Sequence, residues 1–298
     1  MFIDIHCHAY RKCPPIYSFS TPEQVLARFD SLGIEKAGLL PIVSPEIYLP
    51  QANEDILEMV EEYPDRFFAY CNIDPRALTN SADAPLGDLL RYYRDKGCKG
   101  VGEVMPNLPL MDPMVQNLFR CCEEVGLPVI YDGSDQLTGD FGLYDDPGLP
   151  QLEHTLQRFP DLIVFGHGPL FWTEIARLET PGERGYVFRH DGGQVGRQPK
   201  GPIREEGVVP KLMRLYPNLY GDLSDDSPRN ALARDPEYGP RFLTEFQDRL
   251  FFGTDLCFPD MPIHLVDLLL DWRQTGRISE QVFQKVAREN AIRFFGLT

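Results

Sequence analysis

The chain has 298 residues, of which 43% are hydrophobic, so it is long enough for one large α/β barrel or for two ordinary domains. Its 45 acidic residues outnumber its 29 basic ones, and the net charge of −16 argues against nucleic acid as a partner. No run of about 18 apolar residues occurs, so we expect no membrane-spanning helix and no membrane partner.

Two further features of the sequence bear on the cellular compartment of the protein. The N-terminus lacks the basic stretch and apolar segment of a signal peptide. Seven cysteines, an odd number, are scattered without a C-x-x-C pair, which argues against a disulfide framework and against a zinc ribbon. We therefore expect a reduced, cytoplasmic chain that acts on a small molecule, with a homo-oligomer left open.

The first hydrophobic run, at residues 2–6, is predicted to be a strand that ends in two histidines, His6 and His8. Alternate side chains of a strand point to the same face, so both imidazoles should leave the strand together, with Cys7 turned to the other face. Imidazole is the commonest metal ligand, so the pair is half of a potential coordination shell. A lone His-x-His is usually only a polar strand end. The residues at the other strand ends must therefore show whether a metal site is present.

Three helices can be placed from the residues at their ends. Thr21-Pro22 opens a helix that Gly33 ends, Asp112-Pro113 opens one that ends at Gly126, and Ser279 is expected to cap the last helix. Thr, Asp and Ser suit the N-cap, Pro suits the first helical position, and Gly suits the residue after the last turn.

A short pattern recurs before the predicted strands. An aromatic residue, then Pro or Gln, then Asp or Asn precedes an apolar run at residues 63–65, 159–161, 216–218 and 246–248. Each copy is typical of a helix end, a turn and a buried strand. Strands that alternate with helices in this way indicate parallel βαβ units.

Eight strands are predicted, near residues 2–6, 36–43, 67–73, 98–104, 128–132, 162–167, 219–223 and 250–255. Eight such units without an obvious linker predict a single (β/α)8 TIM barrel domain over residues 1–298. A doubly wound sheet is the alternative, but no glycine-rich phosphate turn follows the first strand. Residues 179–207 are rich in Gly, Pro and Arg and show neither a helical nor a strand periodicity. We therefore expect an irregular insertion, either a binding loop or a disordered excursion.

In such a barrel the catalytic groups lie at the carboxyl ends of the strands. Besides the two histidines of strand 1, these ends carry Glu103 on strand 4, Asp132 on strand 5, His167 on strand 6 and Asp255 on strand 8. Each alone has an ordinary interpretation, as a turn acceptor, a satisfied polar residue or a helix cap. Together they should converge at one mouth, and nitrogen and oxygen donors without a thiolate suit Zn²⁺, Mn²⁺ or Fe²⁺.

Four more residues are candidates for binding a substrate. Arg204 in the irregular segment, and Arg229 and Arg234 after strand 7, could orient an anionic group, because guanidinium binds a carboxylate through two hydrogen bonds. Trp172, which follows strand 6, could wall the pocket. The alternatives are solvent exposure for the arginines and helix packing for the tryptophan.

These motifs, in this order, resemble the amidohydrolase superfamily of metal-dependent (β/α)8 enzymes. The resemblance covers the whole chain through Asp4-Ile5-His6-Cys7-His8, Gly166-His167-Gly168 and Phe252-Gly253-Thr254-Asp255. It is nearest to the amidohydrolase-2 group, which includes aminocarboxymuconate-semialdehyde-type decarboxylases and related hydratases. The resemblance implies that His6, His8 and Asp255 bind the metal with His167 near it, and Glu103 stands where some branches carry a strand-4 ligand.

The sequence departs from this group at one position. Strand 5 of the group usually ends in histidine, and the matching residue here is Asp132. A second metal normally uses the strand-5 and strand-6 histidines together, so we expect one Zn (or Mn/Fe) ion per chain, held by His6, His8, Glu103 and Asp255. Asp132 and His167 are expected in or beside that shell.

The expected activity is hydrolysis of a small, anionic amide, ester or lactone. The metal would lower the pKa of a water molecule towards about 7. Asp255 would take the proton of that water, and His167 would polarise the carbonyl or stabilise the oxyanion. The same residues allow decarboxylation or hydration of a small carboxylate. Two other interpretations stay open: a TatD-like nuclease, which the net charge disfavours, and a binding protein that has lost catalysis.

Overall fold

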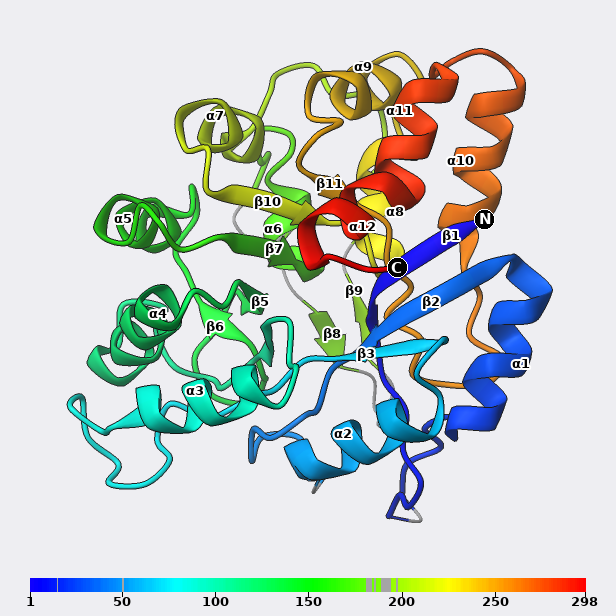
Figure 1. The fold of residues 1–298 in the computed structure, drawn as a ribbon. Coiled ribbons are helices and arrows are strands. Elements are labelled where there is room, and N and C mark those ends of the chain that lie inside the picture. Colours follow the sequence, from blue (N-terminus) through cyan, green and yellow to red (C-terminus); the bar gives the residue numbers. More distant parts are fainter. Residues whose placement is uncertain (15, 50, 181–183, 185, 189–193, 197) are drawn as a thin grey trace.

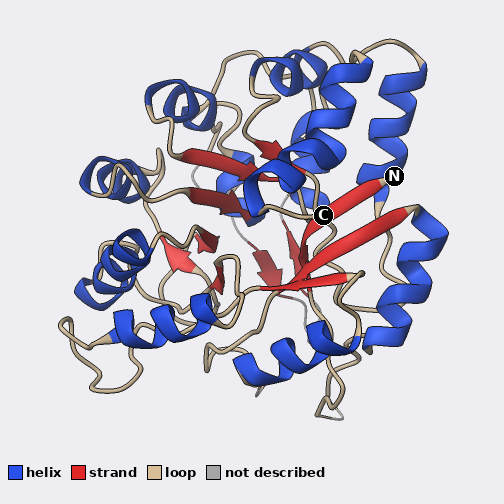
Figure 2. Cartoon of the chain, viewed as in Figure 1, coloured by secondary structure: helices blue, strands red, loops and turns tan. Residues whose placement is uncertain are grey.

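The computed structural model describes residues 1–14, 16–49, 51–180, 184, 186–188, 194–196 and 198–298. Strands gather at the centre and helices surround them, as Figure 2 shows. Along the chain, a strand is followed by one or more helices before the next strand of the central sheet begins (Figure 1). This alternation is the one that the sequence predicts.

Eight parallel strands form the central ring. β1, β2 and β3 pair side by side, and β4, β5, β7, β10 and β11 form a second run. Single parallel bridges, between Cys71 and Val101 and between Cys7 and Leu256, join the two runs at both ends and close the ring. The predicted (β/α)8 barrel is therefore confirmed. The ring strands are β1 Phe2–Cys7, β2 Ile34–Leu39, β3 Phe67–Ala69, β4 Val101–Val104, β5 Val129–Ser134, β7 Val164–His167, β10 Leu219–Asp222 and β11 Leu250–Phe251; β6 Leu143–Tyr144 pairs with β5 outside the ring.

The helices begin and end where their capping residues predict. Thr21 caps α1 through its side chain and Gly33 ends it at φ +70°, while Asp112 caps α4 and Gly126 ends it at φ +78°. Ser279 caps α11, which continues through a π-helical turn into α12. The helices are α1 Pro22–Leu32, α2 Asn53–Glu62, α3 Leu86–Asp95, α4 Pro113–Val125, α5 Pro150–Arg158, α6 Gly168–Thr173, α7 Val208–Leu215, α8 Asp226–Ala233, α9 Tyr238–Glu245, α10 His264–Gln274, α11 Glu280–Gln284, the π-helix η2 Lys285–Glu289 and α12 Asn290–Phe295.

Two hydrophobic cores lie on either side of the strand ring. The larger core fills the space between the strands and the surrounding helices. The smaller core fills the barrel interior, and α12 adds Ala291 and Phe295 to it, which closes the barrel opposite the mouth (Figure 1). The buried members of the interior core are Ile3, Ile5, Leu40, Phe68, Tyr70, Ile130, Phe165, Phe251, Ala291 and Phe295. Each buried Ile, Leu or Phe side chain of this core stabilises the fold by about 1.5–3 kcal/mol.

A bulge in β1 aims its histidines. The pairing of β1 with β2 shifts in register between Asp4 and Cys7. Ile5 belongs to the interior core, yet Cys7, two residues on, belongs to the outer core. The shift therefore lets Ile5 and His6 both face the interior. β-Bulges are common beside active sites because they redirect a side chain in this way.

The segment at residues 179–207 is less irregular than the sequence predicts. It contains two short antiparallel strands, β8 Tyr186–Phe188 and β9 Gln194–Gly196. Three residues are too few for an alternating pattern to be recognised, which explains the difference. The described residues at both ends of the hairpin are anchored: Arg184 pairs with Glu174 at 3.2 Å, and Gln198 donates to Asp226 at 2.6 Å.

Two further predictions concern the chain as a whole. None of the helices in the described residues is both long enough and apolar enough to cross a membrane. All seven cysteines are free thiols.

Candidate metal centre

The two histidines of β1 present one nitrogen each to the same point. Their Nε2 atoms lie 3.2 Å apart, and both rings are buried. The other ring nitrogen is occupied in each case, since Nδ1 of His6 donates to Asp222 at 2.6 Å and Nδ1 of His8 donates to the carbonyl oxygen of Leu40 at 2.8 Å. These bonds favour the tautomers whose Nε2 lone pairs face each other, which is how histidines bind a metal ion.

One carboxylate oxygen from each of two other strand ends approaches the same point. Oε2 of Glu103 lies 3.6 Å from Nε2 of His6 and 3.6 Å from Nε2 of His8. Oδ1 of Asp255 lies 3.5 Å and 3.3 Å from the same two atoms. Ligands held at 2.0–2.1 Å in a tetrahedral shell are about 3.3–3.4 Å apart. The spacing of these donors therefore fits a single small divalent ion.

The donor set has the chemistry of a transition-metal site. Imidazole nitrogen and carboxylate oxygen suit Zn²⁺, Mn²⁺ and Fe²⁺. Glu103 is 4% exposed in its side chain and Asp255 is 19% exposed, so Asp255 is the more accessible of the two carboxylates. The thiol of Cys257 borders this side, 3.7 Å from Oδ1 of Asp255.

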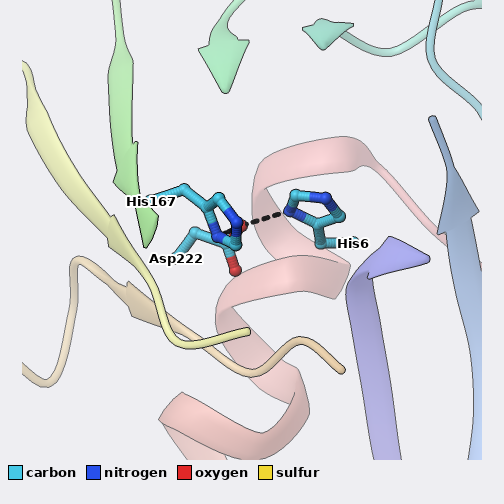
Figure 3. A group of neighbouring side chains, drawn as sticks. All are labelled: His6, His167 and Asp222. Atoms are coloured by element: carbon cyan, nitrogen blue, oxygen red, sulfur yellow. Dashed lines mark hydrogen bonds and ion pairs between the residues drawn. The ribbon is translucent and has the colours of Figure 1, made fainter. Parts of the chain in front are cut away.

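A carboxylate on β10 holds two of the histidines in place. Oδ2 of Asp222 accepts from Nδ1 of His6 and lies 3.3 Å from Nδ1 of His167. Figure 3 shows the three side chains, which come from β1, β7 and β10. Ser224 adds a hydrogen bond of 2.9 Å between its hydroxyl and Nδ1 of His167. The indole of Trp172 donates to the backbone oxygen of Asp222 at 2.9 Å.

The mutual attraction of these groups shifts their pKa values. Burial lowers the pKa of His6, but the carboxylates of Asp222 and Glu103 outweigh burial and raise it well above its ordinary value. At His8, burial also lowers the pKa, but Asp255 and Glu103 raise it above its ordinary value. Burial raises the pKa of Glu103 and of Asp222, yet the histidines hold both well below the usual carboxyl range.

His167 stands beside the donor atoms. Its Nε2 lies 3.4 Å from Oε1 of Glu103, the oxygen that points away from the two β1 histidines. Burial and the proximity of His6 lower the pKa of His167, but Asp222 and Glu103 raise it to about 9. The imidazole is therefore set to carry a proton at neutral pH.

The side chain of Asp132 is fully buried. The ladder between β5 and β7 pairs Asp132 with His167. Among the residues that the structure describes, neither oxygen of Asp132 has a hydrogen-bond partner, although the side chain is fully buried. One of its oxygens lies within 4.8 Å of donor atoms of Glu103 and His167. Burial and the nearby Glu103 raise the pKa of Asp132 well above its ordinary value.

Asp4 connects the first and last strands beneath the site. Its Oδ1 accepts the N–H groups of His6 and Thr254 at 2.9 and 3.0 Å, and its Oδ2 accepts the Thr254 hydroxyl at 2.5 Å. The backbone N–H of Asp255 donates to the carbonyl oxygen of His6 at 2.8 Å. These bonds fix the two strand ends that carry His6 and Asp255.

The structure thus brings together the six residues expected at the strand ends, but it places the expected substrate-binding residues elsewhere. Arg204 and Arg234 line a cavity of about 380 Å³ to which none of the six contributes. Arg229 lies 4.0 Å from Asp226 on its own helix. Trp172 is fully buried, and its indole donates to the backbone oxygen of Asp222. Arginines on loops and helices have no strand register to fix their direction, which is why their positions could not be read from the sequence.

Sequence reasoning missed three residues of the cluster. Asp222 ends strand 7 as directly as Glu103 ends strand 4, so the rule of polar strand ends could have found it. Asp4 alternates with His6 in the opening motif, which was a weaker signal. The hydroxyl of Ser224 had no signal, because it reaches His167 only when the barrel closes.

The sequence profile of the amidohydrolase family matches residues 3–297. The chain belongs to the amidohydrolase family. This confirms the resemblance drawn from the strand-end motifs. Members of the family are metal-dependent hydrolases and decarboxylases, so this amidohydrolase is a metal-dependent enzyme that acts on small molecules. Among curated proteins, no sequence matches it.

Solved structures similar to this amidohydrolase share its barrel. An uncharacterized TIM-barrel protein from Bordetella bronchiseptica is 18% identical, with 99% of this chain and 98% of that chain covered and a TM-score of 0.64. A probable 2-pyrone-4,6-dicarboxylic acid hydrolase from Acinetobacter baumannii, solved with citric acid, is 14% identical, with 99% of both chains covered and a TM-score of 0.61. A dihydroxybenzoic acid decarboxylase from Polaromonas, solved with manganese, is 16% identical, with 99% and 97% covered and a TM-score of 0.58.

Proposed function

We propose that this amidohydrolase hydrolyses a small amide, ester or lactone with one divalent transition-metal ion, held by His6, His8, Glu103 and Asp255. The observation that carries the proposal is the spacing of the donor atoms. The two imidazole nitrogens lie 3.2 Å apart, and the two carboxylate oxygens lie 3.3–3.6 Å from them. Zinc, manganese and iron all suit this set, and manganese occupies the Polaromonas decarboxylase.

When bound, the ion would lower the pKa of a water molecule towards about 7, which supplies the nucleophile, and it would polarise the substrate carbonyl. Asp255 accepts the proton of the attacking water. Its carboxylate is the most exposed of the four donors, and one oxygen remains free when the other faces the histidines. A carboxylate in this position can take a proton and return it to the leaving group.

His167 supplies positive charge and a proton opposite Asp255. Asp222 and Ser224 hold its Nδ1, so Nε2 faces the site. Asp222 and Glu103 raise its pKa to about 9, which favours the protonated ring. A fixed N–H beside the reacting carbonyl stabilises the oxyanion that forms during hydrolysis. Neither step requires a nucleophilic serine or cysteine.

The test is a hydrolysis screen in ¹⁸O-labelled water. Purified protein is loaded with Zn²⁺ or Mn²⁺ and incubated with a panel of small amides, esters and lactones. We expect one ¹⁸O atom in the carboxylate product, and loss of turnover when a chelator removes the metal. An absence of ¹⁸O incorporation across the panel, with metal content near one ion per chain, would contradict hydrolysis.

Decarboxylation is the second candidate, favoured by the decarboxylases among the similar structures. The same donor set can bind a substrate carboxylate next to the carbon that loses CO₂. A panel of hydroxybenzoates and small unsaturated carboxylates distinguishes the two reactions. Release of CO₂ without incorporation of ¹⁸O would replace the hydrolase by a decarboxylase, with the same metal ligands.

A further inference from the structure

A cavity of about 380 Å³ lies beside the end of α6, apart from the metal donors. Its volume is within the range of small-molecule sites, about 300–1,000 Å³. Thr173, the last residue of α6, lines the cavity, whereas His167 directly precedes the first residue of that helix. The helix rises by about 7.5 Å between its first and last residues. Since none of the six strand-end residues lines the cavity, a molecule bound there is a second ligand of the protein.

Backbone hydrogen bonds hold the walls of this cavity. The segment after α6 and the segment before α7 run antiparallel, and the N–H of Arg177 donates to the carbonyl oxygen of Glu205 at 3.0 Å. The segment between β9 and α7 is tied to the chain just after α8, because Asp235 accepts the N–H of Ile203 at 2.8 Å. The cavity is therefore formed before any ligand binds, as small-molecule sites usually are.

The side chains that line the cavity are predominantly basic. Of the described residues, four basic and two acidic ones contribute, so the lining has a net charge of +2 in a chain whose net charge is −16. The Arg177 guanidinium pairs with Glu205 at 2.8 Å, but the two side chains are 71% and 58% exposed, and such pairs contribute little to stability. An anion can therefore compete for this guanidinium. The charged lining residues are Arg177, Glu179, Lys200, Arg204, Glu205 and Arg234.

Two of the basic side chains are available to a ligand. Within the described part of the chain, the side chains of Lys200 and Arg204 form no hydrogen bond or ion pair. Guanidinium binds phosphate through two parallel hydrogen bonds, and an ammonium binds it as a point charge. A phosphate monoester carries a charge of about −1.5 to −2 at pH 7 and has three acceptor oxygens. Its charge therefore matches that of the cavity, which a single carboxylate would only half neutralise.

We infer that this cavity binds a small organic phosphate monoester. Lys200 and Arg204 hold the phosphate, and the other two arginines of the lining add positive charge. Leu178, Pro199 and Pro202 also line the cavity and provide apolar surface for the carbon part of the ligand. The inference does not depend on the proposed hydrolase function. It assigns Arg204, which the sequence suggests for an anionic substrate, to a second molecule.

Calorimetric titration of the metal-loaded protein with glycerol 3-phosphate, at fixed ionic strength, tests the site. Glycerol, which lacks the phosphate, and succinate, which carries two carboxylates, are the comparison ligands. We expect saturable binding of glycerol 3-phosphate, at least about tenfold tighter than that of either comparison ligand, because hydrogen bonds between charged groups are the strong ones.

A pair of double variants locates the binding. Lys200→Gln, Arg204→Gln removes two charged donors from exposed positions and should raise Kd for glycerol 3-phosphate by at least about tenfold. The control, Lys12→Gln, Arg91→Gln, removes one lysine and one arginine from exposed positions on other elements, and it should leave Kd within about twofold because distant surface charges are screened. An equal rise of Kd in both variants would show that the anion responds only to overall charge, which overturns the inference.

A phosphate also binds directly to metal ions, so the titration is repeated on two proteins without the metal. Wild-type protein treated with a chelator and then dialysed, and the double variant His6→Ala, His8→Ala, should both bind glycerol 3-phosphate with an unchanged Kd. Loss of binding in both proteins would place the phosphate at the metal and overturn the inference. The absence of saturable binding to the wild type, or tighter binding of succinate, overturns it as well.

Discussion

Asp222 accepts a hydrogen bond from Nδ1 of His6 over 2.6 Å, although 216 positions separate the two residues in the chain. The bond crosses the barrel from β10 to β1 and leaves Nε2 of His6 directed at the other donors. Carboxylates in this relation to a metal-binding histidine fix its tautomer and raise its basicity. Asp222 also holds His167, so one buried carboxylate orients a proposed ligand and a proposed proton donor.

Asp222→Asn should weaken metal binding by about 10–100-fold, the usual cost of losing such a partner. Asparagine cannot accept from Ser224 N–H through one atom and from His6 through the other, because one of its two atoms is now a donor. Titration with Zn²⁺ against a competing chelator measures the change. Asp226→Asn, four residues along the chain and paired with Arg229, is the control and should leave the affinity within twofold.

The double variant His6→Ala, His8→Ala should fold and lose its metal. The two imidazoles supply half of the proposed shell, and the remaining carboxylates alone bind transition ions weakly. Elemental analysis should find less than about a tenth of the wild-type metal content, with an unchanged circular dichroism spectrum. The matched control removes the two exposed histidines His154 and His264 and should keep its metal. Full occupancy in the first variant would show that the ion binds elsewhere.

Metal affinity should fall steeply as the pH drops. The pKa values of His6 and His8 are raised, so both rings must release a proton before Nε2 can bind an ion. Below these pKa values, each pH unit should raise Kd between about 10-fold and 100-fold, for one or two released protons. Calorimetry in buffers of different ionisation enthalpy counts those protons directly. Binding without proton release at pH 7 would contradict the proposed ligands.

One rule, polar residues at the carboxyl ends of the strands, was enough to predict six residues that the structure brings together. The rule succeeds because the ring of parallel strands brings all these ends to one mouth, whatever the loops do. It could not say what each residue faces. Asp222 and Asp132 both end strands, yet one bonds to two histidines and the other to none, and only closure of the barrel decides this.

Features off the strands were harder to predict. The direction of Arg204 depends on the path of a long segment, and the three-residue strands β8 and β9 are too short to leave a pattern in the sequence. The bulge that turns both Ile5 and His6 inward also leaves no pattern in the sequence, since simple alternation would have placed the two side chains on opposite faces. Capping residues, in contrast, act locally, and they gave the ends of α1 and α4 correctly.

Asp4→Asn should make the metal-free protein more stable at neutral pH. Burial raises the pKa of Asp4 from 3.8 to about 7, against the hydrogen bonds from Thr254 and His6. The folded state therefore binds a proton that the unfolded state has released, so this group's contribution to stability falls between about pH 4 and 7. The amide stays neutral, keeps the two backbone bonds through its oxygen, and donates to the Thr254 hydroxyl where the carboxylate accepts from it. Relative to wild type, its free energy of unfolding should rise by roughly 4 kcal/mol over that window.

Urea unfolding at several pH values, with a chelator present, measures this difference. Asp95→Asn, at the exposed end of α3, is the control and should run parallel to the wild type. A constant difference between Asp4→Asn and wild type from pH 4 to 7 would mean that Asp4 is ionised in the fold throughout.

Asp255→Asn should keep the metal and lose catalysis. The amide oxygen can still face the two histidines from 3.3–3.5 Å, so the ion should remain bound, with Kd raised modestly. An amide cannot accept the proton of the attacking water, and loss of such a base typically costs about 10²–10⁴ in rate. We expect kcat to fall by that factor on any substrate that the screen identifies. Asp260→Asn, an exposed carboxylate on the same loop, is the control. If Asp255→Asn binds metal and keeps a kcat within a few-fold of wild type, another group takes the proton, and His167 would be the next residue to test.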